Sequence, residues 1–220
     1  MKKLSVAVLA SIAVFALPVT ASIAAVSSAN VALTSNYVFR GQTQTDDGAA
    51  IQGSYDIKQS KDDMGWYAGA FASNVDLGGN TGLEVDLFGG WKGSFGKQSA
   101  MGYDVGVVIY EYTDSNTNGV TEVYAGVNYE TAYVKLYMGN GSGIDSYNYL
   151  DVGASFVVLE DIDLDLHAGR YLSSPSSNDL SAALSTEVKG YDLSLGLTYE
   201  DAGPKSDLEF FVTVGKGFDL

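Results

Sequence analysis

The chain has a single histidine, and its surroundings are the first place to look for chemistry. His167 follows Asp165 by two residues, so in an extended strand both side chains lie on one face. Ser155, on the preceding predicted strand, faces the same way, which makes a Ser–His–Asp hydrolase one hypothesis. However, the sequence has no GxSxG turn to present a nucleophile, and a lone histidine is more simply a polar wall residue. Catalysis is therefore the third of three hypotheses about function.

Carboxylates in the predicted loops are a second candidate chemistry, because Ca²⁺ and Mg²⁺ prefer oxygen ligands. The pattern has no EF-hand spacing, so we interpret these groups as a solvated acidic rim that holds no metal and no cofactor. Cysteine is absent, which excludes disulfides and Cys-based metal sites. The rim residues are Asp46, Asp47, Asp76, Asp114, Asp145, Asp179, Asp201 and Asp207.

The most informative chemical feature is an excess of acids on one face of the predicted strands. The acids on this face are Asp56, Glu84, Asp86, Asp104, Glu122, Asp151, Asp163, Asp165, Glu187, Asp192, Glu200 and Glu209. The bases are Arg40, Lys58, Lys92, Lys135 and Lys189. Even complete pairing with these five bases leaves most of the twelve acids unneutralised. A pore lined by such groups would prefer cations.

Tyrosines interleave with the acids on this same face. They are Tyr110, Tyr112, Tyr124, Tyr133, Tyr137, Tyr147, Tyr149 and Tyr171. Aromatic rings beside carboxylates suit small cationic or zwitterionic amines through cation–π contacts. The alternative is that the rings are bulky fillers that narrow or block the interior.

The elements that position these residues are strands, and the stretch 31–58 sets the pattern. Val31, Leu33, Tyr37 and Phe39 are apolar at odd positions, with Ser35 as the one exception, and Ile51, Tyr55 and Ile57 repeat the alternation after the loop QTQTDDGA. Period two on both sides of a polar loop predicts a hairpin with one apolar and one polar face. Each arm has about ten residues, which is the length that a tilted strand needs to cross a bilayer.

The same unit recurs to the end of the chain, giving twelve predicted strands. After the first hairpin they are Gly65–Val75, Leu83–Gly93, Tyr103–Tyr112, Thr121–Tyr129, Ala132–Gly139, Tyr147–Val157, Ile162–Leu172, Leu180–Lys189, Tyr191–Glu200 and Leu208–Phe218. Connections after odd strands are long and polar, whereas several after even strands are very short, as at Glu130-Thr131 and Gly190. This asymmetry is typical of outer-membrane barrels. The sequence therefore predicts an all-β chain that forms one closed antiparallel transmembrane barrel.

The outer face of this barrel is predicted to be apolar and bounded by aromatic rings. Leu83, Leu87, Val134, Leu136, Leu195 and Leu197 belong to the apolar band. The rings expected to face outward at the short-turn end are Tyr55, Tyr67, Trp91, Tyr103, Tyr129, Phe156, Tyr191 and Phe218. A soluble sandwich would also alternate, but its apolar face would point inward. Three outward charges, Glu111, Arg170 and Lys216, lie near strand ends, where long side chains reach the headgroups.

The N-terminus predicts export. Lys2 and Lys3 precede a mostly apolar run over 4–17, followed by Pro18 and small residues. This run is shorter than the roughly 20 residues of a membrane-spanning helix. The segment 1–25 is therefore interpreted as a signal peptide cleaved after Ala21, Ala24 or Ala25, and 26–220 as the barrel.

Charge and the C-terminus indicate the partners. The formal net charge is −15 and becomes −17 without Lys2 and Lys3, so nucleic acid is not an expected partner. The last strand ends in Gly217-Phe218-Asp219-Leu220, which resembles the C-terminal signal of barrel proteins, although many of those end on Phe. We expect contacts with outer-membrane lipids, the barrel-assembly machinery and small solutes, and the sequence assigns no oligomeric state.

A family resemblance supports this interpretation. The stretch SANVALTSNYVFRGQTQTDDGAAIQGSYD, with YAGAFASNVD (67–76) and TEVYAGVNY (121–129), resembles the bacterial TorF-type porin family. The resemblance covers the mature chain and implies an outer-membrane barrel with a pore.

The sequence thus predicts an outer-membrane porin of a Gram-negative bacterium, with a narrow acidic, Tyr-rich lumen for passive diffusion of small cationic, zwitterionic or neutral solutes. The second hypothesis is a structural or adhesion barrel whose lumen is blocked by side chains. The candidate lumen residues are Arg40, Asp86, Glu122, Tyr124, Lys135, Tyr137, Asp165, His167, Glu200 and Glu209. Arg40 is placed at the outer end of the first strand, where it is predicted to pair with Glu200 or Glu209.

Overall fold

A computed structural model describes residues 25–59, 64–79, 81–96, 100–113, 119–141, 144–173, 176–201 and 207–220 of the chain. Twelve strands form one closed antiparallel barrel, as the sequence predicts. They are β1 (Val26–Thr34), β4 (Ala50–Lys58), β5 (Gly65–Asp76), β6 (Thr81–Ser94), β7 (Met101–Thr113), β8 (Val120–Tyr129), β9 (Ala132–Gly141), β10 (Ile144–Leu159), β11 (Ile162–Tyr171), β12 (Asn178–Val188), β13 (Tyr191–Asp201) and β14 (Asp207–Asp219). Two further strands, β2 (Val38–Phe39) and β3 (Gln42–Thr43), pair only with each other.

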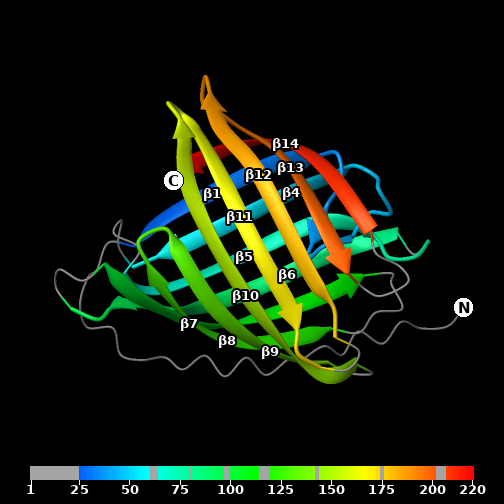
Figure 1. The fold of residues 1–220 in the computed structure, drawn as a ribbon, viewed down its shortest axis with the longest axis horizontal. Coiled ribbons are helices and arrows are strands. Elements are labelled where there is room, and N and C mark those ends of the chain that lie inside the picture. Colours follow the sequence, from blue (N-terminus) through cyan, green and yellow to red (C-terminus); the bar gives the residue numbers. More distant parts are fainter. Residues whose placement is uncertain are drawn as a thin grey trace, which may run out of the picture.

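The barrel closes between its first and last strands. β1 pairs with β14 from Ser28↔Asp219 to Thr34↔Thr213, and on its other side β1 pairs with β4. The strands run side by side around the wall, and β10–β13 cross in front of β4–β6 (Figure 1). Every wall strand therefore has two neighbours, which leaves no open sheet edge.

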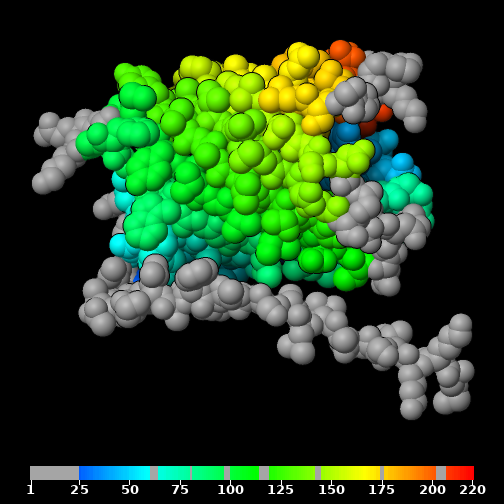
Figure 2. All heavy atoms as spheres, turned by 90° about the horizontal axis from the view of Figure 1, so that it is seen from below, coloured from blue at the N-terminus to red at the C-terminus, as the bar shows by residue number. Residues whose placement is uncertain are grey.

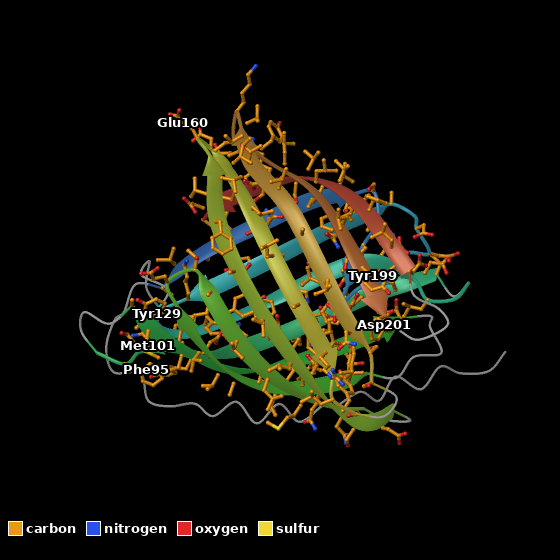
Figure 3. All side chains as sticks on the ribbon, viewed as in Figure 1. Phe95, Met101, Tyr129, Glu160, Tyr199 and Asp201 are labelled. Carbon is orange, nitrogen blue, oxygen red and sulfur yellow. The ribbon has the colours of Figure 1, made fainter. Side chains whose placement is uncertain are left out.

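Short turns define one end of the barrel. Glu130, Asp161 and Lys189 adopt positive φ in the tight connections that follow β8, β10 and β12. We call this end the turn end, and the end where β5 joins β6 and β13 joins β14 the loop end. Figure 3 shows Phe95, Met101, Tyr129 and Glu160 toward the turn end, with Tyr199 and Asp201 at the opposite one. Lys189 belongs to a turn, so its predicted place on the lumen face is wrong.

The outer face of the wall is apolar, as predicted. Exposed side chains on it include Leu83, Leu87, Trp91, Val134, Leu136, Phe156, Leu195 and Leu197. Strand by strand they alternate with buried polar residues, such as Glu84 and Asp86 on β6. The outer surface over β7–β10 is one unbroken wall (Figure 2). Apolar outside and polar inside is the reverse of a soluble fold, and it is the pattern of a barrel that meets lipid.

The first predicted hairpin is wrong beyond Thr34. The wall strand β1 ends there, and residues 35–49, named here the inward segment, fold into the barrel. Tyr37 and Phe39 continue the apolar alternation because they pack inside the lumen, Tyr37 against Phe71 and Phe39 against Tyr110. The alternation was the correct signal for burial, but burial here is against the lumen wall instead of lipid.

Tyr67 also faces the other way from its prediction. Its hydroxyl donates to the Asp104 carboxylate at 2.6 Å and contacts the hydroxyl of Tyr124 inside the lumen. The outer face of β5 consists instead of Trp66 and a row of alanines. On the inner face of this strand, Phe71 packs against Tyr37 of the inward segment.

The predicted signal peptide lies almost entirely outside the described residues, which begin at Ala25. Within the part of the chain that the structure describes, no helix is long and apolar enough to cross a membrane.

Candidate functional site in the barrel lumen

The inward segment crosses the lumen and contacts most of the wall. It leaves β1 at Ser35, whose backbone N–H donates to the carbonyl of Val212 at 2.9 Å. On the other side, the N–H of Asp76 donates to the carbonyl of Gln44 at 2.8 Å. Between these anchors β2 and β3 form a small hairpin with Arg40 and Gly41 at its tip. The segment is therefore attached at β14 and β5, and its tip lies inside the barrel.

Arg40 is the centre of the site. Its Nη1 and Nη2 donate to the two carboxylate oxygens of Glu122 on β8, at 2.6 and 2.9 Å. The guanidinium carbon lies 4.0 Å from the ring centroid of Tyr149 and 4.8 Å from that of Tyr137. Glu122 is 0% exposed, so both partners of this two-pronged ion pair are out of water. Pairing of this kind offsets the cost of burying two charges.

The predicted partners of Arg40 are wrong, although the inward direction is correct. Glu200 accepts a hydrogen bond from Gln42 at 2.7 Å, and Glu209 accepts one from Asn36 at 2.9 Å. Both carboxylates thus hold the inward segment through amides while Arg40 reaches across the barrel to Glu122. The prediction failed because it kept residue 40 in the wall, where its nearest acids would be on β13 and β14.

Gly41 allows the tip to approach the wall closely. Its φ is +83°, and a Cβ added there would lie 2.8 Å from the Cβ of Asp179 and 2.9 Å from that of Glu200. Only glycine combines this backbone conformation with this contact at no cost. The tip is therefore pressed against β12 and β13 while Arg40 points toward β8.

Burial and the neighbouring carboxylates together set the pKa values of Tyr37 and Arg40 in the inward segment. Burial raises the pKa of the Tyr37 phenol, and the nearby carboxylates of Glu84 and Asp86 raise it further, so Tyr37 stays neutral. For Arg40, burial alone would lower the pKa, but its hydrogen bonds with Glu122 and the charge of Glu122 reverse this. The net pKa of Arg40 is raised, and the guanidinium stays charged.

His167 is part of a second polar cluster. Its Nε2 lies 2.6 Å from Asp179 Oδ1, and its Nδ1 lies 3.0 Å from Asp151 Oδ1. The Tyr149 hydroxyl donates to Asp179 at 2.9 Å. Asp179 is 2% exposed, so its predicted place in the solvated rim is wrong, because β12 begins at Asn178 and carries this carboxylate inward.

The hydrolase arrangement is not assembled. Ser155 donates to Asp165 at 2.5 Å, and Ser185 donates to the other oxygen of Asp165 at 3.0 Å. Neither Ser155 nor Asp165 is the partner of His167, whose two nitrogens are taken by Asp151 and Asp179. The hypothesis of a Ser155–His167–Asp165 triad is therefore wrong.

A third cluster lies toward the turn end. Lys135 Nζ is 2.7 Å from Asp104 Oδ2, and its ammonium lies 5.3 Å from the ring centroid of Tyr124. Tyr67 donates to the other oxygen of Asp104. Lys135, Tyr124 and Asp104 thus form a compact group on the wall. Lys135 and Tyr124 line the same cavity as Arg40 and Tyr137.

Two buried acids on β6, Glu84 and Asp86, each have one oxygen that no described residue satisfies. Glu84 accepts a hydrogen bond from Tyr112 at 3.1 Å, and its second oxygen has no hydrogen-bond partner among the described residues. The same holds for one oxygen of Asp86, which is 7% exposed. Both carboxyl groups are thus buried polar groups of the lumen with one oxygen left unpaired by the described residues. In the ranges that the structure covers, no group of three or more acids or histidines is arranged to hold a metal ion.

Open space lies mainly toward the turn end. One cavity of about 690 Å³ is lined by Asp163, Ser185, Glu187, Asp192 and Thr213. A second of about 590 Å³ is lined by Lys92, Asp104, Asn128, Tyr133 and Lys135. We call these two cavities the turn-end vestibule. A smaller cavity of about 360 Å³ lies under the inward segment and is lined by Arg40, Tyr137, Tyr149 and His167.

Sequence reasoning found most of the inward-facing carboxylates but missed four residues of the site. Phe39, whose ring lies 4.7 Å from the Arg40 guanidinium, and Tyr37 were assigned to the outer wall. Tyr67 and Asp179 were assigned to the membrane surface and the rim. The one available signal for Asp179 was that it lies two residues before Ser181 on the same predicted face.

Comparison with known proteins identifies relatives of the chain and of its fold. A family model described as "Bacterial protein of unknown function (Gcw_chp)" matches residues 19–214. No curated protein matches the sequence significantly. Among solved structures, the KdgM porin has a TM-score of 0.62 at 10% identity, covering 87% of this chain and 99% of the porin.

Two further structures share the architecture. The COG4313 outer membrane channel from Pseudomonas putida F1 has a TM-score of 0.53 at 10% identity, covering 88% of this chain and 95% of the channel. The NanC porin also has a TM-score of 0.53 at 10% identity, covering 86% of this chain and 97% of that porin. At these identities the likeness is one of fold, and it agrees with the closed twelve-stranded barrel.

Proposed function

The chain belongs to the Gcw_chp family, whose function is unknown, and from that premise we propose that it is an outer-membrane channel of the porin type. The observation that carries the proposal is the reversed polarity of the barrel. Buried carboxylates such as Glu84 and Glu122 face the lumen, while Leu87 and Leu136 are exposed on the outside. A charged interior within an apolar wall serves the passage of polar solutes across a bilayer.

The fold neighbours and the resemblance to TorF-type porins support the same function. The KdgM and NanC porins and the COG4313 channel share the architecture. The TorF-type assignment is finer than the matched family model and remains part of this proposal. Three further points belong to the same proposal. Residues 1–25 are cleaved, the barrel inserts into the outer membrane of a Gram-negative bacterium, and the barrel-assembly machinery recognises β14.

We further propose that the solutes are small and cationic, zwitterionic or neutral. Arg40 and Lys135 are each already paired with an acid, Glu122 and Asp104. In the first of the two vestibule cavities, Asp163, Glu187 and Asp192 have no basic residue among the residues that line it. The lumen field therefore favours positive charge, and the tyrosines offer their ring faces to it.

A second function is favoured by the inward segment. Residues 35–49 cross the lumen and are anchored to Glu122, Glu200 and Glu209. A barrel whose lumen is permanently blocked in this way would be structural or adhesive and would carry no solute.

Planar-bilayer recordings separate the two functions. The purified mature barrel is inserted into a neutral bilayer, and its reversal potential is measured in a tenfold KCl gradient. We expect discrete conductance steps with a cation-selective reversal potential. A companion protein in which residues 36–48 are replaced by a Gly/Ser linker controls for insertion. If only the companion conducts, the intact chain is a blocked barrel, and an anion-selective current from either protein contradicts the acidic-lumen proposal.

A further inference from the structure

The groups around Arg40 form a more complete cation site than an anchor needs. Glu122 takes two hydrogen bonds from the guanidinium and two more from the hydroxyls of Tyr110 and Tyr147, at 2.9 and 2.7 Å. All four fall on the two oxygens of this one carboxylate, so each oxygen accepts one hydrogen bond from the guanidinium and one from a tyrosine. A single hydrogen bond would be enough to keep the tip in place, whereas this geometry selects a planar, forked cation.

Aromatic faces enclose the same cation. The rings of Tyr149, Tyr137 and Tyr171 lie 4.0, 4.8 and 5.8 Å from the Arg40 guanidinium carbon. Rings at these distances attract a cation, and more strongly where water is excluded. Together with Glu122 these three tyrosines are named the guanidinium box.

The guanidinium box is built entirely from residues of the wall strands. Its residues come from β8, β9, β10 and β11, which pair with one another in register. Tyr149 is held by its own hydrogen bond to Asp179, and Glu122 by Tyr110 and Tyr147. The occupant alone belongs to the inward segment. Its hairpin consists of two strands of two residues each.

The box also opens onto the free part of the lumen. The cavity under the inward segment is lined by Arg40, Tyr137 and Tyr149 and shares Lys135, Tyr137 and Asp151 with the turn-end vestibule. The box and the vestibule are therefore neighbouring spaces of one lumen, with these three residues between them.

We propose that the guanidinium box is a binding site for small guanidinium-bearing solutes, and that Arg40 occupies it as a tethered competitor. The proposal deepens the channel function proposed above by naming a solute class, and it rests on that function for its role in transport. A solute of this kind can bind only when Arg40 leaves the box, so the two guanidinium groups exchange. Because a short tether gives Arg40 an effective concentration on the order of millimolar, the wild-type box yields only to solute above that range.

Methylguanidinium tests the box directly. The Arg40→Ala variant of the mature barrel is prepared in detergent micelles. Its thermal unfolding is measured with increasing methylguanidinium chloride, and with NaCl at equal ionic strength as the control. We expect a saturable rise in Tm with methylguanidinium only. Adding Glu122→Gln should weaken this binding at least about tenfold, because it removes the charged, two-pronged acceptor. Adding Glu160→Gln, in an exposed turn, should leave the binding unchanged.

A second variant keeps the test decisive if Arg40→Ala does not assemble. Arg40→Gln retains donors toward Glu122 but lacks the charge, and the same titrations apply. Equal Tm shifts with methylguanidinium and NaCl, or equal binding with and without Glu122→Gln, overturn the proposal.

Conductance then separates this proposal from the channel function. In bilayers, methylguanidinium should block the Arg40→Ala current and spare the Arg40→Ala/Glu122→Gln current. Saturable binding in micelles without any conductance supports the box and refutes the channel. Conductance without saturable binding supports the channel and refutes the box.

Discussion

The two ends of the lumen share one wall but are filled in different ways. At the loop end the inward segment meets the wall, and Arg40, Glu122 and Tyr149 are buried there. At the turn end the same strands enclose a vestibule of about 690 and 590 Å³ whose acids face open space. Alternation along the strands makes both ends polar. The loop end is narrowed by the fifteen residues of the inward segment, which leave the wall. We therefore expect the loop end to select among solutes and the vestibule at the turn end to hold them before or after passage.

Breaking the buried ion pair should have the largest effect. Glu122→Gln leaves the Arg40 charge without an anion in a site that is 0% exposed at Glu122. We expect a loss of about 3–5 kcal/mol in the free energy of unfolding, measured by urea titration in detergent. The matched change in the vestibule, Glu187→Gln, should cost less than about 0.5 kcal/mol because Glu187 is exposed.

The size of that loss also reports where Arg40 goes. If Glu122→Gln costs less than about 1 kcal/mol while bilayer conductance rises, then Arg40 leaves the lumen instead of remaining buried. If both substitutions cost the same, the contrast between the two ends is wrong.

The second prediction concerns the wall that both ends share. Leu136 faces outward in the middle of β9, and Lys135 beside it faces inward to Asp104. Leu136→Arg should cost about 2–4 kcal/mol and impair assembly, because it places a charge in the hydrocarbon region. Lys135→Arg should assemble normally, because it keeps a charge that already has a partner. Heat-modifiability on gels measures assembly, and equal damage at both positions would contradict the assigned faces.

The third prediction isolates the contact between tip and wall. Gly41 and Gly190 have similar backbone angles, φ +83° and +78°, but only Gly41 has wall atoms where a Cβ would lie. Gly190→Ala should cost about 1 kcal/mol for the backbone alone. Gly41→Ala should cost about 2 kcal/mol or more, because overlap with Asp179 and Glu200 is added. The loss in unfolding free energy for Gly41→Ala minus that for Gly190→Ala measures the contact between the tip and the wall. Equal losses would mean that the tip does not contact the wall.

The smallest effect is expected from a single vestibule charge. Asp163→Asn should change the unfolding free energy by less than about 0.5 kcal/mol, because Asp163 is exposed. It should lower cation preference slightly, as read from the reversal potential in a salt gradient. A loss of selectivity larger than that from Glu84→Gln would move the selectivity-determining region to the turn end.

The sequence was sufficient for the wall because its signal is local. Period two, turn residues and chain-end features predict twelve strands, their order and the outer face, and only details such as Tyr67 and Lys189 differ. The inward segment was not predictable in the same way. Val31, Leu33, Tyr37 and Phe39 share one alternating pattern that only Ser35 interrupts, although the first two face outward and the last two face the lumen. Alternation records that a side chain is buried against something apolar, and it does not distinguish lipid from a lumen wall.

The pairing of Arg40 with Glu122 could not be predicted from the pattern of any single strand. Arg40 was expected beside strands that are its neighbours around the barrel, and its actual partner is 82 positions away, on β8 across the lumen. Contacts across a lumen depend on strand stagger and on the path of the inward segment. Neither is written in the hydrophobic pattern.

The distance along the chain between Arg40 and its contacts has a consequence for the order of folding. Glu122 lies 82 residues away and Tyr171 lies 131 residues away, so the box does not exist until β8 to β11 stand side by side. Contacts of such long sequence separation form late, since the entropy of the intervening chain must be lost first. We therefore expect the segment to stay in solvent during assembly and to seat only in a finished barrel. Seating of Arg40 is then the last event of folding, and an unseated segment would mark a barrel that has not closed.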